Sequence, residues 1–400
     1  MEREKIELLA PAGNFEKLKT ALRFGADAVY VGGKEFSLRA FADNFSAEEL
    51  KAAVEYTHSC GKKIYVATNI YLREGDAERL GAYFSFLQSI GADAALVSDP
   101  GAVCIARQAA PDLPLHLSTQ ANTTNAYAAK FWQGCGISRV VLARELSLRE
   151  IEAIHASCPQ MELEAFVHGA MCISYSGRCL LSDYLDGRSS NRGACVQACR
   201  WGYELRPVSP VEREENLPVE EDKRGTYILN SKDLNMIAHL DRLRDAGVRS
   251  FKIEGRMKSG YYLATVVNAY RRALDGAPIG RCAEELDTVA HRAYTTAYAF
   301  GENHETVNYD NAQTKGTCEY IADVLGWENG RLTVEMRNRF YTGDELEVLS
   351  PDGFFGRKVC VSDLRGEDGE RVDDAKLVQG KYSFLSDMPL SKGDFLRRRR

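Results

Sequence analysis

Short apolar runs alternate with longer amphipathic stretches from the N-terminus to about Gly260, and this alternation restricts the fold more than any other feature of the chain. The short runs are rich in β-branched residues and have the length of strands, whereas the stretches between them have the periodicity of helices. Helices are expected, for example, at Ala47–Ser59 and Leu148–Ser157. The expected strands are 6–12, 28–33, 63–70, 94–99, 115–120, 139–145, 162–168 and 250–254. Strands separated by crossover helices predict a parallel sheet.

A repeated corner between helix and strand supports this organisation. Gly25 and Gly91 each follow a predicted helix, begin the sequence Gly-Ala-Asp-Ala and lead into a predicted strand, and Gly247 has an equivalent position. Glycine adopts the left-handed conformation that ends a helix. The eight predicted βα units favour a closed (β/α)8 barrel of the TIM type. An open doubly wound sheet is the alternative, because strand order cannot be read from one sequence.

The alternation breaks in the segment 169–236, where no crossover helix is recognisable. The segment is rich in Cys, Gly, Ser and Arg and then becomes strongly charged over 212–224, which we interpret as a solvated excursion. Long irregular insertions in compact domains are usually functional or disordered. Because this one follows the seventh predicted strand, it is expected on the catalytic face of the barrel.

The pattern of apolar and polar residues changes again after residue 275. A tyrosine-rich segment, 293–300, is expected to be helical, and short alternating runs such as 331–336 and 345–349 are separated by turn signals. Such runs are typical of a small all-β barrel. We therefore predict a barrel domain over 1–275, a helical connector over 276–314 and a β-barrel domain over 315–400. The arginine run 397–400 is expected to be a disordered charged tail.

Composition excludes several classes of protein. No apolar run reaches the length of a membrane span, and the first residues carry no apolar stretch of signal-peptide type. The chain has 11 cysteines, an odd number at low density, which favours the reducing cytoplasm and predicts thiols that serve metal or redox chemistry. A net charge of −6 argues against a wholly basic nucleic-acid coat but leaves room for local basic patches.

Four of the cysteines, Cys172, Cys179, Cys195 and Cys199, lie together in the irregular segment. A set of thiolates on a flexible loop is what a tetrahedral zinc ion or an iron-sulfur cluster requires. The spacing lacks the Cys-x-x-Cys pairs of a zinc ribbon, and the glycines around the thiols suit a loop wrapped around a bulky cluster. From spacing alone, a cluster and zinc have equal weight, with unmetallated thiols as the third alternative.

At these cysteines the sequence resembles a known family. The run from Glu164 to Cys172, Glu-Ala-Phe-Val-His-Gly-Ala-Met-Cys, is similar to the signature of the collagenase-like peptidases, peptidase family U32. The similarity covers nearly the whole chain. Further matching motifs are Gly177-x-Cys179-Leu-Leu-Ser, the cysteine-containing run 191–200, Asn230-Ser-Lys-Asp-Leu and the opening run 7–13.

The resemblance implies a function that the family name does not suggest. The family that the sequence resembles includes proteins that hydroxylate RNA or ubiquinone without O2 and hold a [4Fe-4S] cluster on four cysteines. The branch with a C-terminal β domain comprises tRNA hydroxylation proteins, which form 5-hydroxyuridine at the wobble position of the anticodon loop and are linked to prephenate. Some members carry a cysteine ligand where this chain has Asn235. The fourth ligand is therefore expected to be Cys199, or a distant thiol such as Cys60.

Further candidates for chemistry lie at the ends of the last two predicted barrel strands. Glu164 and His168 are four residues apart, so both point to one face of the strand and form a possible acid/base pair. Glu254 and Arg256 end the eighth strand, where barrels often bind a phosphate or carboxylate. The structural alternatives are a hydrogen-bonded histidine, a buried ion pair at Glu164, and a salt bridge between Glu254 and Arg256.

Other polar and aromatic side chains are expected near the mouth of the barrel. Uncharged hydrogen-bonding groups would read a base edge or a small acid, or else cap loops. Tyrosines would stack unpaired bases or pack an interface, and cations would line the rim or face solvent. These residues are Asn69 and the run 118–122, the tyrosines Tyr261, Tyr262, Tyr294 and Tyr298, and the cations Lys34, Arg39 and Arg144.

Peptide hydrolysis has little support in the sequence. The chain contains no His-Glu-x-x-His helix motif and no Gly-x-Ser-x-Gly elbow. A triad of His168, Ser174 and Asp183, or a dyad of Cys172 and His168, rests on sequence proximity alone. We therefore expect an iron-sulfur tRNA hydroxylase. The alternatives are a peptidase, and a non-catalytic RNA-binding protein whose thiols hold a structural zinc.

Overall fold

The computed structural model describes residues 5–38, 43–201, 220–222, 225–227, 231–301 and 316–400. The chain divides into two compact units. The first unit comprises Met1–Leu18, Asp27–Met257 and His291–Thr314, and the second comprises Lys19–Ala26, Lys258–Ala290 and Lys315–Arg400. No helix within the described ranges is long and apolar enough to cross a membrane.

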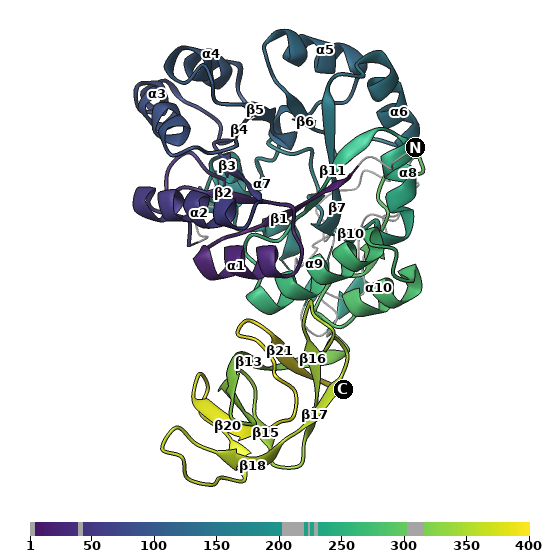
Figure 1. The fold of residues 1–400 in the computed structure, drawn as a ribbon. Helices are drawn as coiled ribbons and strands as arrows, with labels where there is room; N and C mark the ends of the chain where they lie inside the picture. Colours follow the sequence, from purple (N-terminus) through teal and green to yellow (C-terminus); the bar gives the residue numbers. More distant parts are fainter. Residues whose placement is uncertain (1–4, 39–42, 202–219, 223–224, 228–230, 302–315) are drawn as a thin grey trace. The chain divides into compact units, whose positions relative to one another are not determined.

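The first unit contains a closed barrel of eight parallel strands (Figure 1). The barrel closes because β11 pairs with both β1 and β7. The predicted (β/α)8 architecture is confirmed, with most strands shorter than expected. They are β1 Glu7–Pro11, β2 Ala28–Gly32, β3 Lys63–Ala67, β4 Ala94–Val97, β5 Leu115–Leu117, β6 Arg139–Val141, β7 Glu162–Ala170 and β11 Val248–Ile253.

Helices cover the outside of these strands (Figure 1). Ser46 and Ser147 each form a capping box with the glutamate three residues later, which fixes where α2 and α6 begin. Gly91 and Gly247 adopt φ values of 77° and 101°, as the repeated corner predicts. The helices are α1 Phe15–Arg23, α2 Ala47–Ser59, α3 Glu74–Ser89, α4 Pro100–Ala109, α5 Ala126–Gly134, α6 Leu148–Ser157 and α8 Leu240–Asp245.

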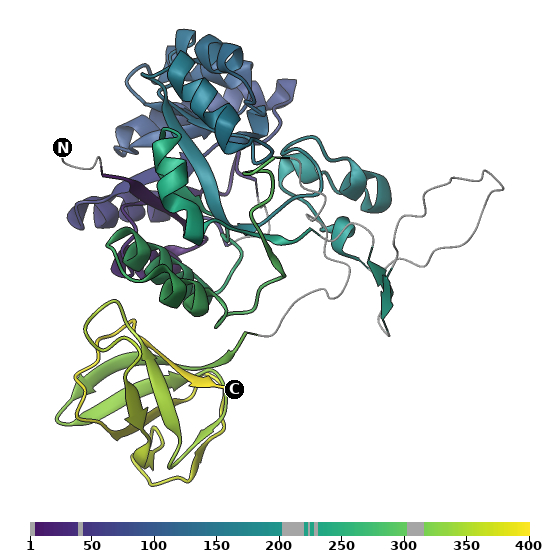
Figure 2. The same cartoon turned by 90° about the vertical axis from the view of Figure 1, so that its right-hand side faces the viewer.

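The segment after β7 forms an irregular extension at the carboxyl end of the barrel. β10 Asp233–Asn235 pairs antiparallel with the end of β7, and β12 Tyr294–Thr295 pairs with β10. Between β7 and β10 lie α7 Leu181–Asp186, the 3-10 helices η2 Ser190–Arg192 and η3 Ala198–Arg200, and the paired strands β8 Glu220–Asp222 and β9 Gly225–Tyr227 (Figure 2). The predicted excursion 212–224 lies largely outside the described residues.

The helix predicted over 293–300 is wrong. This segment forms the short strand β12 followed by turns, because the backbone of Tyr294 and Thr295 pairs with β10. The spacing of its tyrosines matches a helix, but β-branched threonines and strand pairing favour the extended form. The connector predicted over 276–314 is helical at α10 Ile279–Leu286, and its residues 302–314 lie outside the described part of the chain.

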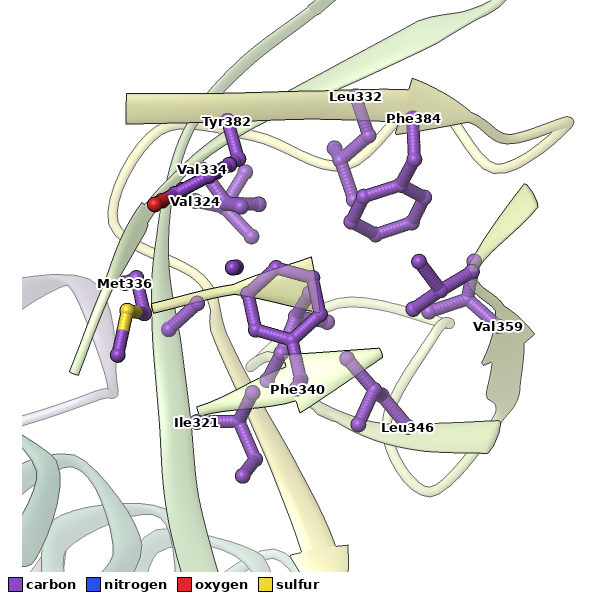
Figure 3. Close-up of a cluster of buried hydrophobic side chains, with 14 of the residues drawn as sticks. Ile321, Val324, Leu332, Val334, Met336, Phe340, Leu346, Val359, Tyr382 and Phe384 are labelled. Atoms are coloured by element: carbon purple, nitrogen blue, oxygen red, sulfur yellow. The ribbon is translucent and has the colours of Figure 1, made fainter. Parts of the chain in front are cut away.

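The second unit combines α9 Gly260–Leu274 and α10 with an antiparallel, barrel-like sheet in the order β17-β16-β21-β13-β14-β20-β18. Alternate residues of β14 are buried, which is the pattern of a strand with one face in a core. Figure 3 shows this core, where Phe340, Phe384 and Leu346 converge. The strands are β13 Cys318–Glu328, β14 Arg331–Met336, β15 Phe340–Tyr341, β16 Glu345–Leu349, β17 Lys358–Cys360, β18 Ser362–Arg365, β19 Asp374–Ala375, β20 Lys381–Leu385 and β21 Phe395–Arg399.

The arginine run is not a disordered tail. Most of it belongs to β21, which lies between β16 and β13. Arg397 is fully buried and donates to Glu285 of α10 at 2.6 Å and to Glu347 of β16. Acidic residues that are distant in sequence therefore neutralise the arginines, which explains why composition alone misassigned them.

Candidate functional site

A network of charges lies inside the barrel, around the buried carboxylate of Glu164 in β7. Glu164 is 1% exposed, and its carboxylate accepts from Lys252 at 2.6 Å and from Arg139 at 3.1 Å. Arg139 also donates to Glu7 at 2.6 Å. Burial raises the pKa of Glu164, but the two cations outweigh burial and lower it overall. Glu164 therefore acts as a buried ion-pair partner, the structural alternative stated above.

His168 lies farther along β7, at the carboxyl end of the barrel. Its ring centroid lies 5.6 Å from that of Tyr294, and its backbone pairs with Asn235 across β7 and β10. Four residues of strand separate its Cα from that of Glu164 by about 13 Å. The pairing of β7 with β11 is irregular between Phe166 and His168, which interrupts the simple alternation on which the predicted pair rested. The carboxylate of Glu164 is engaged by Lys252 and Arg139, and the structure does not join it to His168 as an acid/base pair.

Glu254 and Arg256 lie directly after β11, next to the end of β7. The backbone N–H of Glu254 donates to the carbonyl oxygen of His168 at 2.9 Å. Arg256 is 4% exposed and donates to the hydroxyl of Ser37 at 2.8 Å. A Cβ on Gly32 would lie 2.4 Å from the Arg256 guanidinium, so this glycine provides the space for it. His168, Glu254 and Arg256 thus gather at the carboxyl face, and Glu164 does not.

The four cysteines lie in residues 172–199, here called the cysteine segment, which is anchored to the loop between β3 and α3 and to the first turn of α3. Arg192 donates to the carboxylate of Asp76 at 2.8 Å and to the carbonyl oxygen of Tyr71 at 2.6 Å. The backbone N–H of Tyr71 in turn donates to Asn191 at 3.0 Å. The Arg192 guanidinium beside Asp76 lowers the pKa of that carboxyl. These contacts hold the cysteines over the barrel mouth.

The four predicted thiols are all free. Cys172 is exposed and the other three are partly buried. Burial raises the pKa of Cys199, and the thiols of Cys172, Cys195 and Cys179 contribute to the rise, so each of these three lies within electrostatic reach of Cys199. The backbone N–H of Gln197 donates to the Cys195 sulfur at 3.3 Å.

These thiols provide the donor chemistry of a zinc or iron-sulfur site, and in that sense they fit such a group. Across the ranges that the structure describes, no three His, Cys, Asp or Glu side chains are arranged to hold a metal ion. Cys60, the distant alternative, caps the end of α2 just before β3 begins. It therefore lies at the opposite rim of the barrel from the cysteine segment, whereas Cys199 is part of that segment.

A cavity of about 510 Å³ adjoins Cys172 at the carboxyl end of the barrel. Burial raises the pKa of Glu145, which follows β6 and lines this cavity. Sequence reasoning placed Asn122 and Tyr298 near the mouth but assigned no role to Glu145, Tyr175 or Arg178. Glu145 could have been singled out from the sequence by its position at the end of a predicted strand. The lining residues are Asn122, Glu145, Met171, Cys172, Ile173, Ser174, Tyr175, Arg178, Ser231 and Tyr298.

Several other predicted groups lie elsewhere. Tyr261 and Tyr262 are buried in α9 of the second unit, where Tyr261 stacks on Tyr320 with ring centroids 4.7 Å apart, so both pack an interior. The guanidinium of Arg144 covers the ring of Phe166 at 3.9 Å. Arg39 and Asn230 lie outside the described residues, and Lys34 is exposed.

The alternative of a protease triad, which rested on sequence proximity alone, is not supported by the burial of its three members. Ser174 lines the cavity, whereas Asp183 is exposed on α7 and His168 is buried at the end of β7. A Ser-His-Asp triad requires a carboxylate that orients a histidine from a buried position. An exposed carboxylate on a separate helix does not meet that requirement.

Models of two protein families match the chain, peptidase family U32 over residues 13–309 and the peptidase family U32 C-terminal domain over 316–397. The chain therefore belongs to peptidase family U32. The tRNA hydroxylation protein P of Escherichia coli (strain K12) is 39% identical over 394 residues, which cover 87% of this chain and 87% of that protein.

Two further relatives differ in the activity that their names state. The 23S rRNA 5-hydroxycytidine C2501 synthase of Escherichia coli (strain K12) is 34% identical over 402 residues, covering 97% of this chain and 59% of that protein. The collagenase of Porphyromonas gingivalis (strain ATCC BAA-308 / W83) is 34% identical over 369 residues, covering 86% of each chain. The family thus combines names for RNA hydroxylation with names for proteolysis.

Proposed function

We propose that this protein is a tRNA-modifying hydroxylase that forms 5-hydroxyuridine at the wobble position. The observation that carries the proposal is a segment with four free thiols, one of which, Cys172, lines a cavity of about 510 Å³ at the carboxyl face of the barrel. Barrel enzymes carry their active sites at this face. The names of the tRNA and rRNA hydroxylation relatives support RNA as the substrate. The tRNA substrate assigns the reaction to the cytoplasm.

The proposal includes a [4Fe-4S] cluster held by Cys172, Cys179, Cys195 and Cys199. When bound, the cluster would supply one-electron redox chemistry, which allows hydroxylation without O2. The protein's own residues hold the cysteine segment over the barrel mouth, through Arg192 and Asp76, and present polar groups to the cavity. The anticodon loop supplies an unstacked uridine, because chemistry on a base requires access to its edge. A small carboxylate such as prephenate is the proposed co-substrate.

Anaerobic purification tests the cofactor. The expected result is a brown protein with about four irons per chain, lost when Cys172 or Cys195 is replaced by serine. Cys104→Ser, at an exposed cysteine outside the segment, is the matched control and should keep the iron. A colourless protein with stoichiometric zinc would instead support the zinc-stabilised RNA-binding alternative.

Nucleoside analysis of tRNA tests the reaction. A strain that lacks its own tRNA hydroxylation proteins should regain 5-hydroxyuridine derivatives when it expresses this chain, and should regain none with Cys172→Ser. In a reaction with purified protein and unmodified tRNA, adding prephenate should increase the amount of 5-hydroxyuridine. Absence of the modified nucleoside in a strain with abundant, intact protein would remove the tRNA assignment. Cleavage of collagen-like peptides by a variant lacking all four thiols would favour the peptidase reading.

A further inference from the structure

We propose that the cavity beside Cys172 binds the uracil base of the substrate RNA and that the Oδ1 atom of Asn122 accepts the hydrogen bond of its N3–H. This inference rests on the proposed function and deepens it, because it assigns the residue that recognises the base. It concerns binding alone, so it can fail or hold independently of the hydroxylation step.

The orientation of the Asn122 amide is fixed by its neighbours. Its Nδ2 donates to the carbonyl oxygens of Ser176 at 2.8 Å and of Gln120 at 3.2 Å. Both partners are backbone acceptors, so the NH2 end of the amide must face them. The backbone of Asn122 is left-handed, with φ 52° and ψ 54°, a conformation that asparagine tolerates better than most residues. The side chain is therefore held in one orientation at the carboxyl end of β5.

The opposite end of this amide lacks a partner. Oδ1 of Asn122 is buried and accepts no hydrogen bond from the residues that the structure describes. A buried acceptor without a donor is unfavourable, and native structures rarely keep one without a reason. Asn122 lines the cavity, so we infer that a ligand bound there brings a donor to this atom.

Uracil matches the groups around the cavity. It presents an N3–H donor between two carbonyl acceptors, and the cavity combines the acceptor of Asn122 with donors on Arg178 and Ser231. Tyr175 and Tyr298 add aromatic surface, which binds unpaired bases in RNA recognition. The volume of about 510 Å³ lies within the range of small-molecule sites, roughly 300–1,000 Å³.

Cytosine differs from uracil at the atom that Asn122 would contact. Its N3 is an acceptor, so it would oppose the Oδ1 acceptor of Asn122 and leave both without a donor. A site built to hydrogen-bond a substrate N–H discriminates strongly against analogues that lack it. Asn122 is thus inferred to determine specificity for uridine over cytidine.

Affinity measurements with two RNAs test the contact. The probes are an anticodon stem-loop with uridine at the target position and the same RNA with N3-methyluridine, titrated into anaerobically purified full-length protein. N3-methylation should weaken binding to the wild type about tenfold, the effect of one buried hydrogen bond. Asn122→Gly removes the amide and tolerates the left-handed backbone, and this variant should bind both RNAs with similar affinity. Asn125→Gly, at the cap of α5 outside the cavity, should retain the tenfold difference.

The inference would be overturned if N3-methylation of the RNA reduced the affinity of the wild type and of Asn122→Gly by the same factor. Photo-crosslinking with 4-thiouridine at the target position needs no variant and guards against misfolding. Crosslinks to the peptides that contain Tyr175 or Tyr298 are expected, and crosslinks found only in residues 316–400 would also overturn it. A wild-type protein that restores 5-hydroxyuridine but does not distinguish the two RNAs would refute this inference alone. One that distinguishes them but forms no product would refute only the proposed function.

Discussion

The ammonium group of Lys252 lies 2.6 Å from the carboxylate of Glu164 inside the barrel, where both side chains are almost completely buried. Burial lowers the pKa of Lys252, while Glu164 acts in the opposite direction. Glu164 belongs to the amino-terminal half of β7, whereas Lys252 is the next-to-last residue of β11. This ion pair is the structural alternative for Glu164, whose catalytic role stays a prediction.

We predict that Glu164→Gln destabilises the protein by about 3–5 kcal/mol, because it leaves Lys252 buried without its carboxylate. The double variant Glu164→Leu with Lys252→Met should be less destabilised than the single variant, since it removes both charges together. Urea unfolding measures both effects. A Glu164→Gln protein of wild-type stability that has lost tRNA hydroxylation would contradict this and restore Glu164 as a catalytic candidate.

A buried cluster of one arginine and two glutamates stabilises the second unit. Burial opposes the charge of Arg397, but Glu285 and Glu347 raise its pKa above the ordinary value. Arg397→Met should destabilise the protein by about 3–5 kcal/mol, because two buried carboxylates lose their shared cation. Arg339→Met is the matched control. That arginine is exposed and pairs with Asp374, so its loss should change stability by about 0–1 kcal/mol in thermal unfolding. Equal effects of the two substitutions would show that the burial of Arg397 is not decisive.

The cysteine segment approaches the barrel closely at one glycine. Gly177 has φ 71°, and a Cβ at this position would lie 2.3 Å from the side-chain oxygen of Gln120. Gly187 has a similar φ of 65° but has no neighbour within 4 Å of the same position. Both alanine variants should incur about 1–2 kcal/mol of backbone strain, and Gly177→Ala should additionally displace the segment.

Hydrogen exchange separates the two glycine variants. Amides near Tyr71 and Asn191 should lose protection in Gly177→Ala and keep it in Gly187→Ala. Identical amide protection in the two variants would show that the cysteine segment accommodates the methyl group of alanine at position 177.

The sequence predicted the barrel well because its signals are local. The capping serines and the glycine corners fix where α2, α6 and several strands begin, and each signal acts within a few residues. Strand ends were less accurate: 118–120 continued the predicted fifth strand, but Ser118 caps a 3-10 turn that redirects the chain. Polar residues after a strand have no periodicity that distinguishes a continued strand from a 3-10 turn.

Long-range relationships were beyond the reach of the sequence. The partners of Arg397 are 112 and 50 residues away, and no local pattern connects them. Glu145 and Arg178 come from separate loops that both line the cavity. The thiols could be grouped in advance because they lie in one segment. Their ligand assignment stays a prediction, as does the catalytic role of Glu164, His168, Glu254 and Arg256.

The link between Arg192 and Asp76 should make the cysteine segment sensitive to acid. Arg192 lowers the pKa of Asp76 below its unfolded value of about 3.9, so the contribution of Asp76 to stability is complete above about pH 4. It is lost as the pH falls through the lower, folded pKa, where the carboxylate takes up a proton. Asp76→Asn should weaken the attachment of the segment by about 1–3 kcal/mol at neutral pH. The difference from wild type should shrink in acid, because protonation mimics the amide.

Hydrogen exchange of residues 190–192, measured from neutral pH to below pH 4 and corrected for intrinsic rates, should reveal this convergence. Asp186→Asn is the control, since that exposed carboxylate is 3.7 Å from Arg188 in the same segment and should change protection little at any pH. If the Asp76→Asn protein kept wild-type protection at neutral pH, the other contacts of η2, such as the backbone bond between Tyr71 and Asn191, would be sufficient to hold the cysteines over the barrel.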